Sequence, residues 1–459
     1  METTTLNSWG AKEFTGLDLG DERLNKRAVK LVEQFSARPT VSIPGATGSW
    51  ADTMAAYRFF NNENTEWRKI LAPHAAQTQQ RMSQHPVVLC LQDTTELNFN
   101  GQDILGLGSL SYDAQRGMYL HPTYAVTPER EPLGITDIWM WSRERRDEIK
   151  KAAQTDTEKK EKEASDEAKE SIRWITGYEN VATMALGLPE TRLVYVADRE
   201  SDIIALMERA EELGTPADWL IRARHNRNLP GGDKLWGSAS SGESLGGIIF
   251  TMPGRDGQKA REVRQELWAT RIMIPAGKTK TIEVTCIIAR EIDAPPGVKP
   301  VEWRLLSNRE APTLADVIEL IDWYRARWEI EMFFNVLKNA CHIEALQLSS
   351  TNRLEKALVL FMIVSWRIAY LMRSGRVCPT LDATLFFHPD EIRGAYLLTK
   401  KKPPDKPPTL NEVLRLVAQL GGFLNRQCDG EPGLKTIWIG LQRVMDSAAT
   451  LQALREELK

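Results

Sequence analysis

The sequence lacks the cysteine and histidine patterns of several common classes of protein. Its five cysteines are scattered and form no Cys-x-x-Cys pair, which favours a reducing compartment and argues against a structural zinc site. Its six histidines show no His-Glu-x-x-His or His-x-His spacing, so no zinc-enzyme motif is present. The first ten residues have neither the basic nor the apolar stretch of a secretion signal, and we expect none.

Long apolar runs and a strong net charge are also missing. The longest apolar run, residues 357–366, is too short to cross a bilayer and predicts a buried helix, so we expect no membrane contact. The net charge is -3, which argues against a protein that coats nucleic acid by bulk charge but leaves room for local basic patches. With 459 residues, the chain is long enough for several domains.

Apolar strands alternate with helices in the middle of the chain, which predicts an α/β domain. Two of these strands end in a carboxylate, Asp93 in one and Asp198 in the other, and the carboxyl end of a strand is where such sheets place their chemistry. An apolar helix at 352–374 is expected to pack on the sheet. The predicted strands and hairpin are 86–95, 124–145, 191–202 and 218–228.

Residues 229–300 break this alternation. Short strands are predicted at about 247–252, 262–273 and 280–290, separated by Gly, Pro and Asp turns such as the one at 253–258. We interpret this part as a β-rich insertion, after which a strand at 303–307 returns to the main domain.

The two ends of the chain are predicted to be helical. Helices at 19–35 and 50–64 carry basic side chains and flank a loop, which suits a small DNA-reading module, although acids balance the bases and a solvated bundle is the alternative. The charged stretch 143–170 is expected to be a solvated loop or an exposed helix. A stiff linker at 399–408 precedes two final helices at 409–421 and 434–457.

One long helix is predicted at 313–338, with Thr313 and Asp316 as its capping box. At about 100° per residue, four polar side chains share one face of this helix: Tyr324, Arg327, Glu331 and Lys338. Asp322 and Glu329 fall on the opposite side, where we expect solvated charges. A row of intrahelical salt bridges is the alternative interpretation of the polar face.

Three carboxylates therefore stand out: Asp93, Asp198 and Glu331. Three buried acids that converge would repel one another unless cations compensate, and hard oxygen ligands suit Mg²⁺ or Mn²⁺. Two such ions about 4 Å apart can activate a water or a 3′-hydroxyl for phosphoryl transfer. For each aspartate alone, a helix cap or turn is the alternative.

Three motifs carry a resemblance to a known family. They are LQDTTELNF at 91–99, VADRESDI at 196–203 and YRARWEIEMFFNVLK at 324–338, the last with the spacing Tyr-x2-Arg-x3-Glu-x6-Lys. The chain resembles the DDE transposases of bacterial insertion sequences, in the Y-R-E-K branch that includes the transposon Tn-five transposase. Similarity extends to both ends and is weakest at 143–170 and 229–300.

The resemblance implies an α/β fold with a ribonuclease H-like catalytic domain at 76–375 that contains the β-rich insertion at 229–300. It also implies an N-terminal helical DNA-end-binding domain at 1–75 and a C-terminal helical dimerisation domain at 376–459. By position, Asp93, Asp198 and Glu331 would be the catalytic residues and would hold two Mg²⁺ ions per active site, with Mn²⁺ as a substitute.

The remaining site residues implied by the resemblance would bind DNA. They are Tyr324, Arg327 and Lys338 at phosphates near the end, Trp303 and Trp328 at a flipped base, the basic cluster Arg222, Arg224 and His225, and Arg23, Arg27 and Arg58 in the N-terminal domain. For either tryptophan, core packing is the alternative.

The implied activity is cut-and-paste transposition by a homodimer, in which each subunit cuts the end bound mainly by the other. The enzyme would cleave the inverted-repeat ends of a transposon, pass through a DNA hairpin, and join the ends to double-stranded target DNA. It would work in the bacterial cytoplasm, at the nucleoid. Two other classes stay open: a non-catalytic DNA-binding inhibitor of transposition, and a two-metal nuclease without strand transfer.

Overall fold

The computed structural model describes residues 8–38, 42–112, 114–143, 156–252, 261–277, 279–426 and 429–457. Within these ranges, the side chains of 156–170, 377, 434–435 and 456–457 are not described. The turn predicted at 253–258 therefore lies outside the described residues. Of the charged stretch predicted at 143–170, residues 144–155 lie outside them, and only the helical backbone of 156–170 is described.

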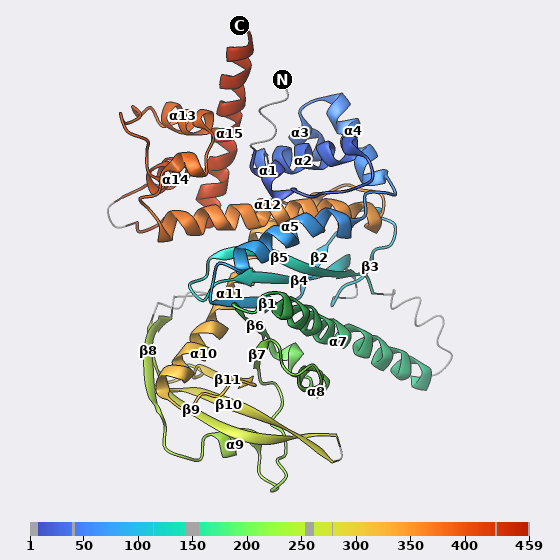
Figure 1. The fold of residues 1–459 in the computed structure, drawn as a ribbon, viewed down its shortest axis with the longest axis vertical. Helices are drawn as coiled ribbons and strands as arrows, with labels where there is room; N and C mark the ends of the chain where they lie inside the picture. The colour runs from blue at the N-terminus through green and yellow to red at the C-terminus, as the bar shows by residue number, and fades with distance from the viewer. Residues whose placement is uncertain are drawn as a thin grey trace.

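A mixed sheet of eleven described strands runs through the molecule (Figure 1). Its strands are β1 (Val87–Gln92), β2 (Thr95–Asn98), β3 (Gly108–Ser109), β4 (Arg116–Val126), β5 (Pro132–Trp141), β6 (Arg192–Ala197), β7 (Asp218–Arg222), β8 (Gly246–Met252), β9 (Arg261–Ala276), β10 (Lys280–Ile292) and β11 (Glu302–Ser307). Strands β1 and β6 are almost continuously buried, as their apolar runs predict for central strands covered on both faces.

The centre of the sheet has the arrangement expected of a ribonuclease H-like domain. Strands β5, β4 and β1 are antiparallel neighbours, and β1, β6 and β7 are parallel neighbours, so the order in space is β5-β4-β1-β6-β7. The parallel pairs need crossover connections, which helices α7 (Asp156–Gly187) and α8 (Ile204–Glu212) supply. The α/β fold class predicted from the alternating pattern is confirmed.

The β-rich insertion extends this same sheet. Strands β8, β9 and β10 are antiparallel neighbours, and β11 joins β10 to β7 with Leu305 opposite Arg222. All three predicted strands are present, and β9 and β10 end only a few residues beyond the ranges predicted for them. The insertion therefore returns the chain directly beside the end of β7.

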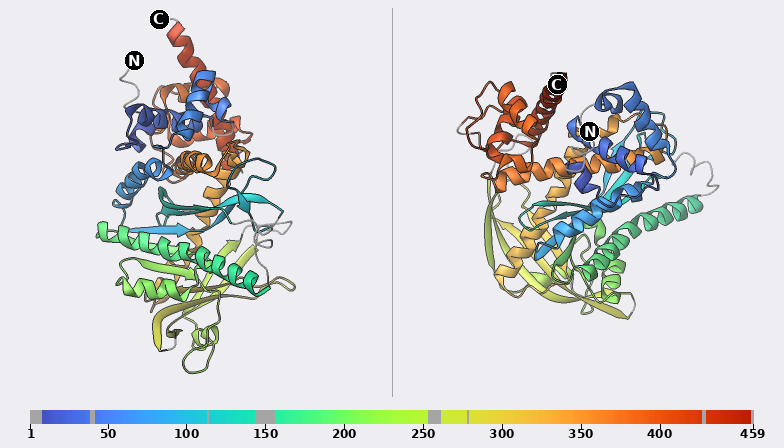
Figure 2. Two further views of the ribbon diagram at one scale, coloured as in Figure 1. Left: turned by 90° about the vertical axis from the view of Figure 1, so that its right-hand side faces the viewer. Right: turned by 45° about the horizontal axis from the view of Figure 1, so that its top comes forward.

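Two further layers of helices cover the sheet (Figures 1 and 2). The remaining helices are α1 (Trp9–Glu13), α2 (Glu22–Ala37), α3 (Ile43–Thr47), α4 (Trp50–Asn61), α5 (Trp67–Met82), α9 (Leu235–Ala239), α10 (Leu314–Ala326), α11 (Trp328–Asn335), α12 (Thr351–Val377), α13 (Pro389–Leu398), α14 (Leu410–Leu420) and α15 (Leu434–Glu457). Helices α5 and α12 pack against β5, and α7 packs on the other side against β1 and β6. Each side of the sheet has its own apolar core.

Helix α12 is the base on which both ends of the chain rest. It contacts α2 and α4 of the N-terminal helices and α14 of the C-terminal helices, which lie side by side above it in Figures 1 and 2. Residues 351–376 are long and apolar enough to span a membrane, yet most of this stretch is buried inside the protein. The predicted packing of 352–374 on the sheet is confirmed.

A buried polar cluster joins the first helix to the catalytic region. His74 Nδ1 lies 2.5 Å from Glu13 Oε1, and His74 Nε2 accepts the N–H of Ile135 in β5 at 3.0 Å. Arg81 also binds Glu13, at 3.0 Å. Because one ring nitrogen donates and the other accepts, the neutral imidazole satisfies both partners.

We expect this cluster to make the protein less stable in acid. Burial lowers the pKa of His74 in the folded protein. Below a pH of about 6.5 the histidine therefore binds a proton in the unfolded chain but stays neutral in the folded one. Burial alone would raise the pKa of Glu13, but His74 and Arg81 leave it lowered, so its stabilising contribution is lost as the pH falls through the folded pKa. Both effects reduce the free energy of unfolding as the pH falls.

His74→Gln should flatten the pH dependence of the melting temperature between about pH 7 and 5. The histidine contributes a slope of at most about 1.4 kcal/mol per pH unit, since a single proton is involved. His85→Gln, just beyond the same helix, serves as the control and should keep the wild-type slope. An unchanged slope in His74→Gln would contradict the assignment.

Candidate active site

The central strands bring two carboxylates together. Strands β1 and β6 are parallel, and Gln92 pairs with Ala197 in their last register position. Asp93 and Asp198 therefore leave the sheet at the same level, on strands that lie about 4.8 Å apart. This is the carboxyl edge of the parallel strands, where α/β sheets hold their ligands.

Asp198 is not used as a helix cap. It precedes the short 3-10 turn Arg199–Ser201, but its side chain makes no capping hydrogen bond. Asp93 Oδ1 accepts the N–H of Thr94 at 2.8 Å, which leaves Oδ2 available to other partners. A helix-capping role therefore accounts for neither carboxylate, because strand β2 rather than a helix follows Asp93.

The prediction of one long helix at 313–338 is wrong in its middle and at its end. The capping box of Thr313 and Asp316 is present, but the helix is divided at Arg327 into α10 and α11. There the hydrogen bonds tighten to a three-residue spacing, from Arg327 N–H to the Tyr324 carbonyl and from Ile330 N–H to the Arg327 carbonyl. After α11 the chain widens into a π-helical turn, Val336–Ala340.

Arg327 lies between the acids at the division of the helix. Its Nη1 is 2.6 Å from Asp93 Oδ2, and its Nη2 is 2.5 Å from Glu331 Oε1. The Tyr324 hydroxyl donates to Asp198 Oδ1 at 3.3 Å. Thus all three acids meet side chains of one polar helix face, although only the bond to Glu331 is intrahelical. A simple intrahelical salt-bridge row does not describe this contact.

The pKa values of Asp93, Arg327 and Tyr324 are all shifted by burial and by the charges gathered here. Burial raises the pKa of Asp93 to about 6, and the charges of Asp198 and Glu331 add to the rise, while Arg327 opposes it. Burial lowers the pKa of Arg327, but Tyr324 and the acids outweigh it and hold that pKa above its ordinary value. Burial also raises the pKa of Tyr324 to about 12, so its hydroxyl keeps its proton. A second positive charge here would relieve the repulsion.

The donor set fits a divalent cation of the hard class. Carboxylate oxygens are the ligands that Mg²⁺ and Mn²⁺ prefer. In this structure the positive charge between Asp93 and Glu331 is the guanidinium of Arg327. Within the described part of the chain, no group of three or more Asp, Glu, His or Cys side chains is gathered closely enough to hold a metal ion.

Burial lowers the pKa of Lys338, which stands in the π turn, while Glu344 and Glu96 oppose that shift. One further prediction for the helix at 313–338 is corrected. Glu329 is not a solvated charge, because burial raises its pKa and Arg130 lies 3.9 Å away. Asp322 is exposed beside Arg325, as predicted.

Three of the predicted DNA-binding residues, Arg222, Arg224 and Trp303, line a basic pocket of about 430 Å³, and His225 is not among its lining residues. Trp303 on β11 lines it and also stacks on Phe250 at 5.5 Å, so it is both a packing residue and a wall of the pocket. The pocket also holds residues that the sequence analysis did not single out, and its charged and aromatic lining residues are Arg199, Arg222, Arg224, Trp236, Lys299, Glu302, Trp303 and Arg304. Trp328, on α11, is 42% exposed.

Asp202 binds the loop that follows β7, residues 223–228, which is rich in basic side chains and is called the basic loop below. Its buried Oδ2 accepts the backbone N–H groups of Arg224 and His225 at 2.7 and 2.9 Å, and its Oδ1 pairs with Arg227 at 2.5 Å. The side chains of Arg224 and His225 are exposed. Asp202 belongs to the motif at 196–203, so the sequence could have marked it as a candidate residue. Its role could not be predicted, because it depends on a contact with Arg224, more than twenty residues away along the chain.

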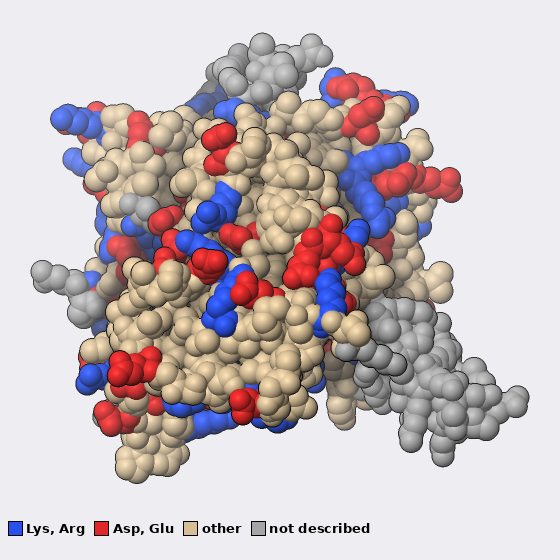
Figure 3. Space-filling view, turned by 60° about the horizontal axis from the view of Figure 1, so that its bottom comes forward, with Lys and Arg blue, Asp and Glu red and all other residues tan. Residues whose placement is uncertain are grey.

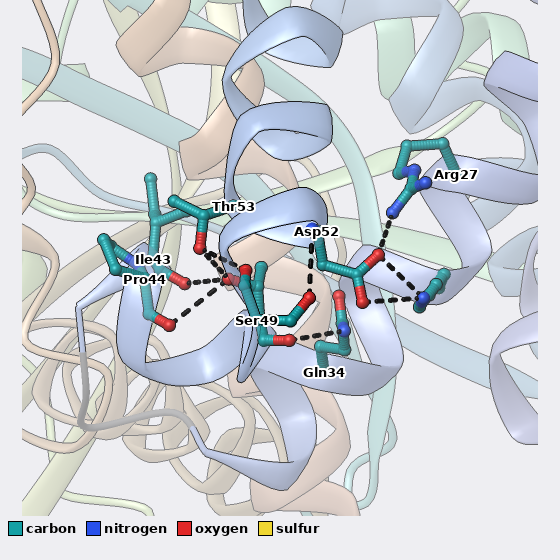
Figure 4. Close-up of polar contacts among 9 residues, drawn as sticks. Arg27, Gln34, Ile43, Pro44, Ser49, Asp52 and Thr53 are labelled. Atoms are coloured by element: carbon teal, nitrogen blue, oxygen red, sulfur yellow. Dashed lines mark hydrogen bonds and ion pairs between the residues drawn. The ribbon is translucent and has the colours of Figure 1, made fainter.

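The predicted bases of the N-terminal helices differ in their partners. Arg27 binds Asp52 at 2.8 Å, and Lys30 binds the same carboxylate, as Figure 4 shows for Asp52 facing Arg27. Arg23 pairs with its neighbour Asp21 and is almost fully exposed, while Arg58 is exposed on α4. Acids therefore balance two of these bases in the DNA-free protein, as the mixed composition of the segment suggested.

The surface of the insertion is mixed in charge as well. Figure 3, which looks onto the end of the molecule formed by the insertion, shows basic and acidic side chains interspersed on that face. This pattern agrees with the net charge of -3. Several basic side chains are instead gathered in the pocket lined by the end of β7, by β11 and by Arg199.

Family comparisons match three successive parts of the chain. A transposase DNA-binding model matches residues 6–65, a transposase DDE domain model matches 143–366, and a Tn5 transposase dimerisation domain model matches 363–453. The DDE match includes Asp198 and Glu331 and begins after Asp93, so the place of Asp93 rests on the β1–β6 register. Fold and matches together define a DNA-cleaving and strand-transferring enzyme that depends on a divalent metal.

The chain belongs to the DDE transposases and is Tn5-like, with a DNA-binding domain before the catalytic region and a dimerisation domain after it. Among solved structures, it is similar to the piggyBac transposase synaptic complex with hairpin DNA, at 10% identity and a TM-score of 0.37, over 100% of this chain and 77% of that one. That likeness is too weak to bear on function.

Arg327→Gln should destabilise the metal-free protein by about 1–3 kcal/mol, because it leaves partly buried carboxylates without their shared cation. The range is set below that of a fully buried pair, since the Asp93 and Glu331 side chains are 22% and 33% exposed. Unfolding in EDTA and in MgCl₂ would measure it, and Mg²⁺ should stabilise the variant more than the wild type.

Arg325→Gln is the matched control, since this half-buried arginine on the same helix pairs with solvent-facing Asp322 rather than with the three acids. Its effect should stay below about 1 kcal/mol in either buffer. Equal losses for the two variants would show that Arg327 has no special role among the acids.

Proposed function

We propose that this transposase excises an insertion sequence and reinserts it by two-metal phosphoryl transfer at Asp93, Asp198 and Glu331. The observation that carries the proposal is the convergence of Asp93 and Asp198 on neighbouring parallel strands, with Arg327 joining Asp93 to Glu331. When bound, two Mg²⁺ ions, or Mn²⁺ in their place, supply an activated nucleophile and stabilise the leaving oxygen.

The residues of this chain orient the reacting DNA. Asp93, Asp198 and Glu331 hold their carboxylates at one edge of the sheet, and Tyr324 keeps Asp198 in place through its hydroxyl. A water first attacks the phosphorus at the end of the element and releases a 3′-hydroxyl. That hydroxyl then attacks the opposite strand, which closes a hairpin and releases the flanking DNA. A second water opens the hairpin and frees the 3′-hydroxyl again, and this hydroxyl attacks a phosphodiester of the target DNA.

Arg327 changes partners in this scheme. In the DNA-free protein it neutralises Asp93 and Glu331. When the acids take up metal, its guanidinium turns to a phosphate oxygen near the cleaved bond, which it can bind in a bidentate way. Lys338 and Tyr324 contact neighbouring phosphates of the same strand.

The basic pocket receives the end of the element. Arg222, Arg224 and His225 contact phosphates, and a base next to the cleavage point leaves the stack and packs against Trp303. Trp328, exposed beside the acids, fills the gap that the base leaves. Arg23, Arg27 and Arg58 bind the inner part of the end through the N-terminal helices.

The active assembly is a homodimer that holds two inverted-repeat ends, with each subunit cutting the end bound mainly by its partner. The Tn5-type dimerisation domain at 363–453 supports a dimer built through the C-terminal helices. The enzyme works at the nucleoid of the bacterial cytoplasm, where its DNA substrates lie.

Glu331→Gln should abolish Mg²⁺-dependent cleavage of end DNA while leaving binding of that DNA intact, because it removes one charged oxygen ligand without changing the shape of the side chain. The DNA flanking the gene supplies the ends as short inverted repeats. A cleavage assay and a gel shift on the same DNA would measure both properties.

Glu329→Gln, two residues earlier and paired with Arg130 rather than with the acids, is the matched control and should cleave normally. Retained cleavage in Glu331→Gln would rule out the mechanism. Joining of pre-cut ends to a plasmid by the wild type distinguishes a transposase from a plain nuclease, which would yield no joined product.

Trp303→Ala should slow cleavage of intact ends by about tenfold, since stacking of one base on an aromatic side chain contributes about 1–3 kcal/mol. An end that lacks the flipped base gives the control, because wild type and variant should then cleave it at similar rates. If the variant is equally slow relative to the wild type on both substrates, Trp303 acts by packing against Phe250 instead.

A further inference from the structure

A chain of buried hydrogen bonds lies behind the acids. His121 on β4 contacts both neighbours of Asp93: its Nδ1 is 2.9 Å from the Thr94 hydroxyl, and its Nε2 is 3.1 Å from Gln92 Oε1. Gln92 Nε2 donates in turn to the Thr123 hydroxyl at 2.8 Å. Gln92 and His121 are both buried. The residues on each side of Asp93 are therefore held by one imidazole.

Arg173 on α7 continues this chain to the other aspartate. Its Nε donates to the Thr94 hydroxyl at 3.3 Å, and its Nη2 donates to Glu200 Oε2 at 2.7 Å. Glu200 stands in the turn Arg199–Ser201 that directly follows Asp198. A single guanidinium thus bridges the segment after Asp93 and the segment after Asp198.

The surroundings of Arg173 make this bridge rigid. The residue is only 6% exposed, and its guanidinium lies 5.1 Å from the Trp141 ring and 5.2 Å from the Trp174 ring. The close approach of α7 to β1 depends on Gly177, where a Cβ would come within 2.6 Å of the Gln92 side chain. A buried guanidinium is costly unless its partners are fixed, so its placement here calls for a reason.

We propose that Arg173 is a positioning residue that sets the separation of Asp93 and Asp198 through Thr94 and Glu200. The inference rests on the proposed role of these aspartates in metal binding. The β1–β6 register fixes where the two backbones leave the sheet, but each carboxylate then depends on the segment that follows it. Arg173 joins these two segments through Thr94 and Glu200, and His121 joins Thr94 to β4.

Metal affinity is the property that this arrangement should control. To bind two divalent ions, the aspartate oxygens must be positioned to within a fraction of an ångström. Removing a residue that hydrogen-bonds to a metal ligand typically lowers the affinity for the metal by about 10–100-fold. Global stability should change less, because Glu200 is exposed and its loss leaves the core intact.

The test compares Glu200→Gln and Arg173→Lys with the wild type, all as the full chain. Mn²⁺ is the probe, and the free ion is measured by electron paramagnetic resonance during titration, so the readout does not depend on activity. Melting temperatures in EDTA monitor folding. We expect Mn²⁺ affinity to fall about tenfold in Glu200→Gln and in Arg173→Lys, with a smaller change in melting temperature.

Glu212→Gln is the matched control. Glu212 is an exposed acid that pairs with Arg209 at 3.0 Å, on α8, away from the aspartates. It should bind Mn²⁺ as the wild type does. The double variant Arg173→Lys with Glu200→Gln should be no weaker than the weaker single variant, because both changes break the same bridge.

Two outcomes would overturn the proposal. If Glu200→Gln and Arg173→Lys bind Mn²⁺ within twofold of the wild type, Arg173 is a packing residue and the role of the aspartates is untouched. If Glu331→Gln and the wild type bind Mn²⁺ equally weakly, the metal site itself is misplaced and both proposals fail.

Discussion

The parallel pairing of β1 with β6 is the constraint on which the site depends. It places Asp93 and Asp198 at the same level of one sheet edge, where their charges repel, and burial raises the pKa of Asp93 to about 6. The structure meets this cost with Arg327, which binds Asp93 and Glu331. Arg327 thus supplies the positive charge that balances these neighbouring carboxylates.

The same principle extends beyond the acids. Arg27 and Lys30 are held by Asp52, and Arg227 is held by Asp202, so several basic side chains have acidic partners before DNA arrives. These pairs fit a chain whose acidic side chains slightly outnumber its basic ones, with a net charge of -3.

Much of the fold could be predicted because it follows local patterns. The apolar runs before Asp93 and Asp198 form central strands, and the capping box at Thr313 opens a helix as expected. The division at Arg327 could not be predicted, since no Gly or Pro marks it and the backbone there stays helical in its angles. The π turn that carries Lys338 could not be predicted either, because such a turn leaves no signature in residue type.

By itself, the sequence determined the types of side chain, the strands and helices that carry them, and the motif spacing that marks the family, because these depend on composition and short-range periodicity. Only the tertiary structure decided which groups meet. The sheet register made neighbours of Asp93 and Asp198, the packing of α7 set Arg173 between Thr94 and Glu200, and the insertion brought Trp303 beside the basic loop. Such contacts join residues far apart in the chain, and their geometry is settled by the shared core rather than by any local preference.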